Sequence, residues 1–502
     1  MTWVQPLDPI GNLALSAIVA AIPVLVLLIS LCIFRLSGYI SAAITSIATI
    51  FVALGVYRAP IEIVVSSYFY GVLFGIWPVV WVIINAMFLY NLSKETGSLE
   101  DLRNWIQTNL PVSISIISLF ISFLFGGLVE GIDGYGFPVA ISSVLLTQFG
   151  LNPIKAIVVS LIANTIPVPF ASLGVPVDTL SMVSGLDLRE ICSMISAQLA
   201  VLSVIVVILI FYVSSGLKET KRYLDVALVS SICFGVSLYI VSTFIDPHLT
   251  GLIPPIISIF FTLAYLRVRK LRGSEKTSMR RAIRGWFPWL VVVFIMTSFG
   301  IIGLHQLIEV DWEVSNLHMM VFIPLYNREY SAVYRWQPFA HGTMVLLASL
   351  LVVIVYRVRP SKALRIYLKT WKQMSKAIIT ILQVLGIAFL MNYVGLSFTL
   401  GYALSKTGFI YPFLSTFIGW IGTFVSGSAT GSNALFGNLQ RVSAELLNLS
   451  PYITVSANCS GGAFGKMICL QSIVVGTAAV GLAGREGEIM KKLMPYSVFL
   501  TI

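Results

Sequence analysis

The sequence predicts an all-α polytopic membrane protein with inverted repeats and some broken or re-entrant helices. Three observations predict this. Of the 502 residues, 57% are hydrophobic and only 11% are charged, against about 25% charged in soluble domains. The mean hydropathy is +0.92. The apolar residues fall in runs close to the roughly 20 residues that a helix needs to cross a bilayer, which gives about 12 to 14 transmembrane helices.

The expected spans follow the chain as apolar runs closed by charged or turn-forming residues. The run 11–34 has no basic segment before it and no small-residue cleavage site, so we expect a retained helix and not a signal peptide. Segments 137–149 and 432–447 are shorter and flanked by glycine, as half-helices are. Full spans are expected near 11–34, 38–57, 68–91, 112–129, 155–171, 190–213, 223–244, 249–266, 286–304, 341–356, 377–396, 409–426 and 465–483.

The distribution of the net charge of +11 predicts the topology. Segment 267–284 holds eight Lys/Arg and one Glu, and segment 357–376 holds seven Lys/Arg and no acid. Segment 305–340 holds four acids and two arginines. By the positive-inside rule the first two segments are cytoplasmic and the third is external, which places the N-terminus outside the cell membrane. Basic residues confined to loops do not form the groove or patch that binds nucleic acid, so no nucleic-acid partner is expected. The protein is instead expected to be embedded in the lipid bilayer.

Matched segments indicate an internal duplication. Leu151–Pro153 matches Leu449–Pro451 at an offset of 298, and Ala163–Thr165 matches Ala457–Cys459 at an offset of 294. In the charge frame above, equivalent spans cross in opposite senses, as in transporters with inverted repeats. We expect N-terminal helices over 1–67, a first repeat that forms the substrate and transport half over 68–214, connecting helices with the basic loops over 215–376, and a second repeat over 377–502.

Two polar breaks in apolar surroundings predict the functional site. An ionisable side chain such as Glu130 or Asp133 costs about 2.5 to 3.5 kcal/mol at bilayer depth, so it marks protein interior or water. Half-helix N-termini attract a small carboxylate, and neutral hydroxyls suit a carboxylate that carries a hydroxyl. We expect Glu130 to couple proton entry to the substrate, and Asp133 is the second candidate for this role. The expected substrate-binding residues are Gly134, Tyr135, Gly136, Asn164, Thr165, Ser428, Thr430, Ser432, Asn433, Asn458, Ser460 and Lys466.

Other roles for these residues stay open. Clustered small residues also permit close helix packing, and Glu130 could serve only as a hydrogen-bonding group for broken backbone. Lys466 could balance a carboxylate or extend to an interface. The four histidines fall at span edges or in the external segment, and His-Glu-x-x-His is absent from the sequence, so an enzyme, a metal and a cofactor are not expected. An intramembrane hydrolase using Asp133 and Asp178 is a remote alternative.

The chain resembles the L-lactate permease family of proton-coupled symporters. The marks are Glu130-Gly131, Gly134 to Ala140, Asn164-Thr165 with Pro167-Val168, Gly427-Ser428 with Ser432 to Phe436, and Gly461-Gly462 with Gly465 to Ile468 and Gln471-Ser472. The resemblance implies an ion-transporter-superfamily fold and import of L-lactate, D-lactate and glycolate with protons across the plasma membrane. It leaves a homodimer open. A sodium-coupled carboxylate transporter, with Asn164-Thr165 and Ser456 to Cys459 around the ion, is the alternative.

The chain departs from the resembled family at two positions. Ala429 stands where familiar members carry Asp, and Asp133 stands where they carry a small residue. The two positions differ by 296, close to the repeat offset, so we expect that the acid has moved to its pseudo-symmetric counterpart. After Pro495 about eight apolar residues remain, too few for the further span of resembled members.

Overall fold

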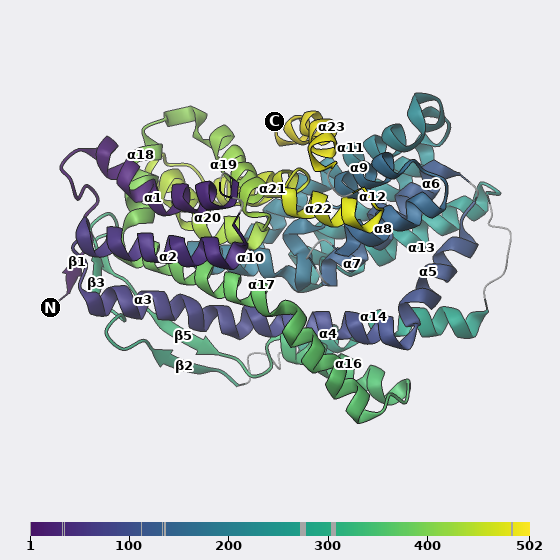
Figure 1. Cartoon of the computed structure of the whole chain (residues 1–502), viewed down its shortest axis with the longest axis horizontal. Helices are drawn as coiled ribbons and strands as arrows, with labels where there is room; N and C mark the ends of the chain where they lie inside the picture. The colour runs from purple at the N-terminus through teal and green to yellow at the C-terminus, as the bar shows by residue number, and fades with distance from the viewer. Residues whose placement is uncertain are drawn as a thin grey trace.

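The computed structural model describes residues 2–32, 34, 36–111, 113–132, 134, 137–271, 278–302, 308–482 and 485–502. These residues are mostly helical, which confirms the fold class (Figure 1). Seven described helices are long and apolar enough to cross a membrane. A pair bent by 66°, Pro153–Ala163 with Val168–Ser184, forms an eighth candidate, and shorter apolar helices pack among them.

The helices follow one another in the order labelled in Figure 1. The first thirteen are α1 (Leu13–Cys32), α2 (Gly38–Gly55), α3 (Ile61–Phe74), α4 (Trp81–Thr96), α5 (Ser98–Asn109), α6 (Ile114–Ser118), α7 (Gly126–Ile132), α8 (Phe137–Gln148), α9 (Pro153–Ala163), α10 (Ala171–Ser184), α11 (Leu188–Arg222), α12 (Leu224–Ile240) and α13 (Ile253–Val268). The remainder are α14 (Met279–Ile302), α16 (His341–Val355), α17 (Pro360–Val394), α18 (Leu396–Ser405), α19 (Tyr411–Ser426), α20 (Ala429–Leu446), α21 (Pro451–Lys466), α22 (Leu470–Ala479) and α23 (Glu486–Thr501).

The segment expected to be external contains short strands that the sequence did not predict. Strands β2 (Val310–Glu313) and β5 (Val333–Trp336) form a two-stranded antiparallel sheet. The N-terminal strand β1 (Trp3–Val4) pairs in parallel with β3 (Val321–Ile323), which pairs with β4 (Arg328–Glu329). Hydroxyls of Tyr70 and Tyr393 donate to the carbonyls of Val333 and Ser331, so this small β layer is tied to α3 and α17.

Several expected spans have different bounds in the structure. The expected span 377–396 is the end of the 35-residue helix α17, which starts at Pro360 and stops where Gly395 takes a left-handed conformation. The expected span 465–483 starts too late, because the candidate span there is Pro451–Thr477, in which α21 ends at Lys466 and α22 starts at Leu470. Apolar composition continues across that break, so hydropathy alone does not detect it.

The same order of elements occurs twice along the chain. In each set a helix leads to a glycine break and another helix, then a helix that begins with proline, a second break and further helices. The first set runs from α6 to α11 and the second from α19 to α23. The two proline-started helices, α9 and α21, begin at Pro153 and Pro451. The structural order therefore follows the duplicated segments in the sequence.

Small residues let α19 and α21 approach closely. A Cβ atom added to Gly419 would lie 1.9 Å from the Asn458 carbonyl oxygen, and one added to Gly461 would lie 2.1 Å from the Thr416 oxygen. Gly465 meets the Trp420 carbonyl in the same way, at 2.2 Å. Backbone-to-backbone packing of this kind is typical of helix pairs in membranes. It fixes α21, and hence Lys466 at its end, against α19 within the second repeat.

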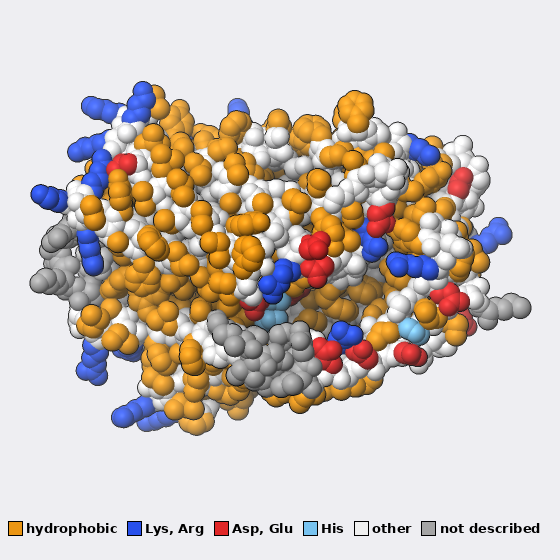
Figure 2. Space-filling model, turned by 180° about the vertical axis from the view of Figure 1, so that it is seen from behind, with side chains coloured by type: hydrophobic (Ala, Val, Ile, Leu, Met, Phe, Trp, Pro, Cys, Tyr) orange, Lys and Arg blue, Asp and Glu red, His pale blue; other side chains and the backbone are white. Residues whose placement is uncertain are grey.

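Charge and apolar surface separate along the long axis of the molecule. Figure 2 shows most Lys and Arg side chains at one end, a broad hydrophobic surface in the middle, and most acidic side chains toward the other end. Exposed apolar residues such as Phe51, Phe244 and Phe294 suit contact with lipid tails. The separation matches the predicted frame, while the outside position of the N-terminus stays a prediction.

We predict that Gly419→Ala destabilises the protein by about 1 to 3 kcal/mol or more, because its methyl group overlaps the α21 backbone. The matched control is Gly487→Ala in α23, where nothing lies within 4 Å of the added Cβ. Melting of the purified variants in detergent checks this. Equal melting temperatures for the two variants would contradict the close approach of α19 and α21.

Candidate functional site

The breaks of both repeats meet at one pocket. Its walls come from the segment after α7, the bend between α9 and α10, the α19–α20 break, the α21–α22 break and one residue of α17. The described lining residues are Gly134, Val168, Ala171, Ser172, Val175, Pro176, Ile381, Gly427, Ser428, Ala429, Thr430, Lys466, Gln471 and Ser472. The pocket therefore has a polar side made of helix ends and an apolar side suited to a methyl group.

Lys466 supplies the cation among the described lining residues. Its Nζ donates to the Gly134 carbonyl at 3.0 Å and lies 3.7 Å from Oε1 of Glu130. The Lys466 side chain is 10% exposed and the Glu130 side chain is fully buried. An ion pair so far from water depends on each partner, because removing one leaves a buried, uncompensated charge. Lys466 thus joins the end of α21 to the break of the first repeat.

The Glu130 carboxylate has few polar neighbours. Among the described residues, neither of its oxygens accepts a hydrogen bond that meets ordinary distance and angle limits. The polar side chains that face it are those of Lys466 and Asn164. Asn164 lies at the end of α9, 4% exposed, and its Oδ1 has no hydrogen-bond donor within the described part of the chain. A carboxylate with one cation at 3.7 Å and little other solvation is suited to change its protonation state when that cation is engaged elsewhere.

Helix N-termini point positive ends at the same pocket. Gly427 takes φ +69° and lets the chain turn sharply from α19 into α20. Ser428 caps the 18-residue helix α20 by accepting a hydrogen bond from the Gly431 N–H at 3.0 Å. The first N–H groups of a helix have no intrahelical acceptor, and with the helix dipole they favour an anion. Gln471 and Ser472 bring the start of α22 to the same place.

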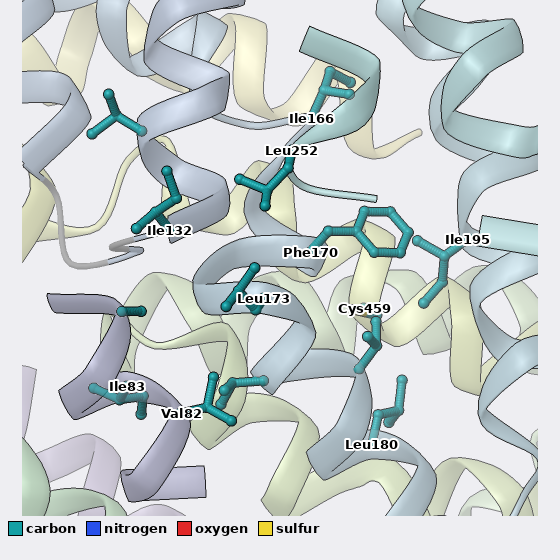
Figure 3. Packing of buried hydrophobic residues seen from close by; sticks show 14 of the residues in the cluster. Val82, Ile83, Ile132, Ile166, Phe170, Leu173, Leu180, Ile195, Leu252 and Cys459 are labelled. Atoms are coloured by element: carbon teal, nitrogen blue, oxygen red, sulfur yellow. The ribbon is translucent and has the colours of Figure 1, made fainter. Parts of the chain in front are cut away.

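The start of α10 has an unusual backbone. Ser172, Leu173 and Gly174 all adopt left-handed conformations, with φ of +48°, +58° and +86°. Such conformations cost non-glycine residues about 1 to 3 kcal/mol each and persist where the surroundings fix them. Figure 3 shows Leu173 and Phe170 held in the hydrophobic core near Leu252 and Ile132. The anchored Leu173 thereby keeps Ser172 at the pocket, which no sequence signal indicates.

The structure brings some of the expected site residues together. Gly134, Ser428, Thr430 and Lys466 line the pocket, and Glu130 and Asn164 lie directly behind Lys466. Asp133, Tyr135 and Gly136 lie outside the described residues. Sequence reasoning did not expect Ser172, Ile381, Gln471 and Ser472 to line the pocket, although the last two belong to a motif that it quoted.

The other expected substrate-binding residues are buried away from this lining. The Thr165 hydroxyl donates to the Ile162 carbonyl and the Ser432 hydroxyl to the Gly419 carbonyl. The Ser460 hydroxyl donates to Gln198 on α11. These contacts place the three hydroxyls within or between helices of the protein.

Asn433 and Asn458 belong to a buried amide network. The Asn458 amide donates to Asn433 Oδ1 at 3.0 Å, and Asn433 donates to the Pro176 carbonyl at 2.9 Å. Gln440 donates to Asn458 Oδ1 and accepts from the Tyr411 hydroxyl. Satisfied networks of this kind rigidify a core. This one links α10 to α20 and α21 and so fixes the two helix ends behind the pocket.

A histidine–carboxylate cluster lies beside the start of α10. Nε2 of His248 lies 2.9 Å from Asp178 on α10, and its Nδ1 lies 2.8 Å from Asp246. The ring of His341, at the start of α16, stacks on His248 with centroids 3.5 Å apart. Asp246, His248 and His341 are close enough to be considered for a metal ion. Both nitrogens of His248 face carboxylates and the two rings are parallel, which fits an imidazolium between two carboxylates better than converging ligands.

Electrostatics support that interpretation. Burial lowers the pKa of His248, and the carboxylates of Asp178 and Asp246 more than offset it, raising the pKa to about 10. Burial opposes ionisation of Asp246, while the charges of His248 and His341 outweigh it and hold the pKa of Asp246 well below its usual range. The cluster therefore ties α10 to the turn before α13. Its residue on α10, Asp178, lies two positions after the pocket-lining Pro176.

Comparisons with known proteins identify the family of this chain. The family profile described as L-lactate permease matches residues 16–502. The chain belongs to the L-lactate permease family. It is 34% identical over 537 residues to the glycolate permease GlcA of Escherichia coli (strain K12), covering 99% of this chain and 96% of that protein. It is 35% identical to an L-lactate permease of Salmonella typhimurium with the same coverage, and 32% identical to one of Bacillus subtilis, covering 100% and 97%.

Membership of the L-lactate permease family confirms a multi-pass membrane transporter and not an enzyme. Among solved structures, the Alcanivorax borkumensis YdaH transporter covers 84% of this chain and 82% of its own, at 15% identity and a TM-score of 0.43. That score is too low for an element-by-element comparison of the two folds.

We predict that Asp178→Asn destabilises the protein by about 3 kcal/mol, because it leaves the buried His248 charge short of a partner. The matched control is Asp225→Asn, which removes a half-exposed partner of Arg269 and should cost at most about 1 kcal/mol. Melting temperatures in detergent at neutral pH check the difference. Similar losses in both variants would contradict a buried ion pair at His248.

The cluster also predicts how stability depends on pH. The pKa of His248 is raised in the folded protein, so its contribution is complete below its ordinary value near 6.5 and is lost as pH rises toward about 10. Melting temperature should therefore fall over this interval, and it should fall less steeply in His248→Gln. A slope that His248→Gln leaves unchanged would show that the imidazolium does not contribute.

Proposed function

We propose that this protein imports L-lactate and the related 2-hydroxymonocarboxylates D-lactate and glycolate by proton symport. The observation that carries the proposal is the position of Lys466, which lines the pocket and pairs with Glu130. One buried cation serves two anions, the Glu130 carboxylate and the carboxylate of the substrate. The glycolate and L-lactate permeases among its relatives support the substrate class.

The charge balance requires a proton when the substrate binds. With the pocket empty, the Lys466 ammonium balances the Glu130 carboxylate. A substrate carboxylate that enters the pocket takes the ammonium and the N-terminal dipole of α20 for itself. Two carboxylates about 4 Å apart in a medium of effective dielectric constant about 20 repel by about 4 kcal/mol. Protonation of Glu130 removes that repulsion, so substrate and proton bind together and leave together.

The remaining lining residues suit the rest of a small 2-hydroxy acid. Ser428, Thr430 and Ser472 provide hydroxyls, and Gln471 provides an amide, beside the expected carboxylate position. Val168, Ala171 and Val175 form an apolar wall that can contact the methyl group of lactate. Glycolate lacks that methyl group and would leave the wall empty. The hydroxyls and the amide would recognise the features that lactate and glycolate share.

Both repeats contribute to the site, which supports the proposed division of the chain at residues 68–214 and 377–502. Gly134 comes from the first break and Gly427 from the second, and both adopt left-handed conformations with φ of +66° and +69°. We propose that these halves carry the substrate and that the helices of 1–67 and 215–376 frame them. We also propose that the N-terminus lies outside the cell and that the protein forms a homodimer.

Sodium coupling is the second candidate. It is favoured by Asn164 Oδ1, a buried carbonyl-type oxygen at the end of α9 to which no described residue donates a hydrogen bond. Asn458, the expected partner at the second repeat, already uses its amide in the network with Asn433 and Gln440. Proton coupling therefore accounts for more of the site.

We predict that liposomes containing the purified protein accumulate radiolabelled L-lactate under an inward proton gradient. An inward sodium gradient without a proton gradient should produce no accumulation. Protein-free liposomes serve as the control. Accumulation with sodium alone would transfer the coupling role from Glu130 to the Asn164 turn.

We predict that Glu130→Gln and Lys466→Met fail differently. Glutamine imitates the protonated acid, so Glu130→Gln should still exchange internal for external lactate but lose accumulation driven by protons. Lys466→Met removes a charged partner worth about 1.5 to 3 kcal/mol and should weaken lactate binding roughly 10- to 150-fold. Lys492→Met, which removes an exposed partner of Glu488, is the matched control. Proton-driven accumulation that survives in Glu130→Gln would rule out this coupling.

Asp133 is proposed as the second coupling group. It would take over the role of the aspartate that resembled members carry at the position of Ala429. Asp133→Asn should then alter the dependence of uptake on pH. The measurement is initial lactate uptake between mildly acidic and mildly alkaline external pH, with Glu130→Gln measured in parallel. An unchanged profile in Asp133→Asn would leave Glu130 as the coupling acid.

A further inference from the structure

A second compartment adjoins the carboxylate pocket. It lies between α17 and α20, and Leu27 of α1 and Gly38 of α2 also line it. It shares Ile381, Ser428 and Thr430 with the carboxylate pocket. Beyond these shared residues its walls are mostly apolar. The site thus has a charged end at Lys466 and an aliphatic end on the far side of Ser428 and Thr430.

Two helices supply matching walls to this compartment. On α17 the wall residues are Thr380, Ile381, Val384 and Leu385, and on α20 they include Thr430, Gly431, Ala434 and Leu435. Both sets repeat at intervals of one and four residues, so each lies on a single helix face. Leu385, Ala434 and Leu435 are 1%, 2% and 5% exposed. These three wall residues are therefore part of the protein interior, while Thr380, Ile381 and Thr430 are half-buried.

We propose that this compartment receives the aliphatic tail of 2-hydroxy acids longer than lactate, which makes the protein a carrier of short-chain 2-hydroxyalkanoates. The inference rests on the proposed function, since it needs the carboxylate at Lys466 and the 2-hydroxyl near Ser428 and Thr430. From that anchor point, carbon 3 takes the place of the lactate methyl group in the carboxylate pocket, and the carbons beyond it extend past Ile381 between Val384 and Ala434. A tail placed there leaves water for an apolar interior.

The size of the compartment is set by small residues. Gly431 and Ala434 on α20 are small lining residues, and a larger side chain at Ala434 would occupy part of the compartment. Leu435 and Leu27 are the large side chains that α20 and α1 contribute to the lining. The fit should hence improve with each methylene until the tail reaches these leucines, at about five or six carbons in total, and then fall. Burial of one methylene corresponds to about 0.8 kcal/mol, or about a fourfold gain in affinity at most.

The test is inhibition of labelled L-lactate uptake into liposomes by glycolate and by 2-hydroxybutanoate, 2-hydroxypentanoate and 2-hydroxyhexanoate. In the wild type, each added methylene should lower the inhibition constant about two- to fourfold up to about five carbons. Direct uptake of labelled 2-hydroxybutanoate distinguishes a transported substrate from a blocking ligand. The matching unsubstituted acids, without the 2-hydroxyl, should compete less well at every length.

Two variants move the chain-length preference in opposite directions. Ala434→Leu should fill the compartment and raise the ratio of the 2-hydroxypentanoate to the glycolate inhibition constant about tenfold. Leu435→Ala should shift the best length upward by one or two carbons. Because the ratio is taken within one variant, a lower yield of folded protein does not affect it.

Three results would decide the matter. A wild-type inhibition constant that rises with every methylene, with ratios unchanged in both variants, would overturn the inference and assign the compartment to lipid or to packing. Inhibition without uptake of 2-hydroxybutanoate would overturn the claim that these acids are carried. Absence of lactate uptake itself would instead contradict the proposed function, which is a different failure.

Discussion

The buried ammonium of Lys466 is the interaction on which the rest of the site depends. It is held at the end of α21, donates to the Gly134 carbonyl and lies 3.7 Å from Glu130. A lysine in this position is stable only because the second repeat places it against the break of the first. The close glycine packing of α19 on α21 and the amide network around Asn458 fix that position. The same contacts leave the ammonium facing a pocket, where an anion can compete with Glu130 for it.

Broken helices provide what an apolar interior otherwise lacks. At Gly427 and Gly134 the chain turns through left-handed glycine conformations, and the helix ends so created present polar backbone at the depth of the apolar core. Ser172 and Leu173 also present polar backbone at the start of α10. The packed core around Leu173 stabilises their unfavourable backbone conformations. The histidine–carboxylate cluster then ties α10 to the turn before α13. The pocket is thereby rigid on its polar side, while its other wall, α17, carries the apolar Ile381.

Much of this site could be predicted from the sequence. A glutamate among glycines in an apolar run, a second glycine–serine break and a lysine after Gly461-Gly462 are unusual in a membrane protein, and the structure places Glu130, Gly134, Ser428, Thr430 and Lys466 together. The sequence does not show which buried polar groups already have partners. Asn433 and Asn458 look like ligands in the sequence, whereas in the structure they bond to each other and to neighbouring helices.

Other features depend on contacts between distant segments. Asp178, His248 and His341 lie on three separate elements, so only the folded chain reveals their cluster. The break between α21 and α22 has apolar residues on both sides, and hydropathy therefore predicts one continuous span there. The strands of 310–336 are too short for a periodic signal. In each case a tertiary contact, and not a local preference, decides the structure.

The exchange of Lys466 between Glu130 and the substrate can be tested by measuring proton uptake when the substrate binds. Purified protein in weakly buffered detergent solution, with a pH indicator, would be mixed with L-lactate while bound lactate is counted. We expect that about one proton is taken up for each lactate bound near neutral pH, and that Glu130→Gln binds lactate with no proton uptake. Lactate binding without proton uptake in the wild type, or uptake that persists in Glu130→Gln, would contradict the exchange of Lys466 between Glu130 and the substrate.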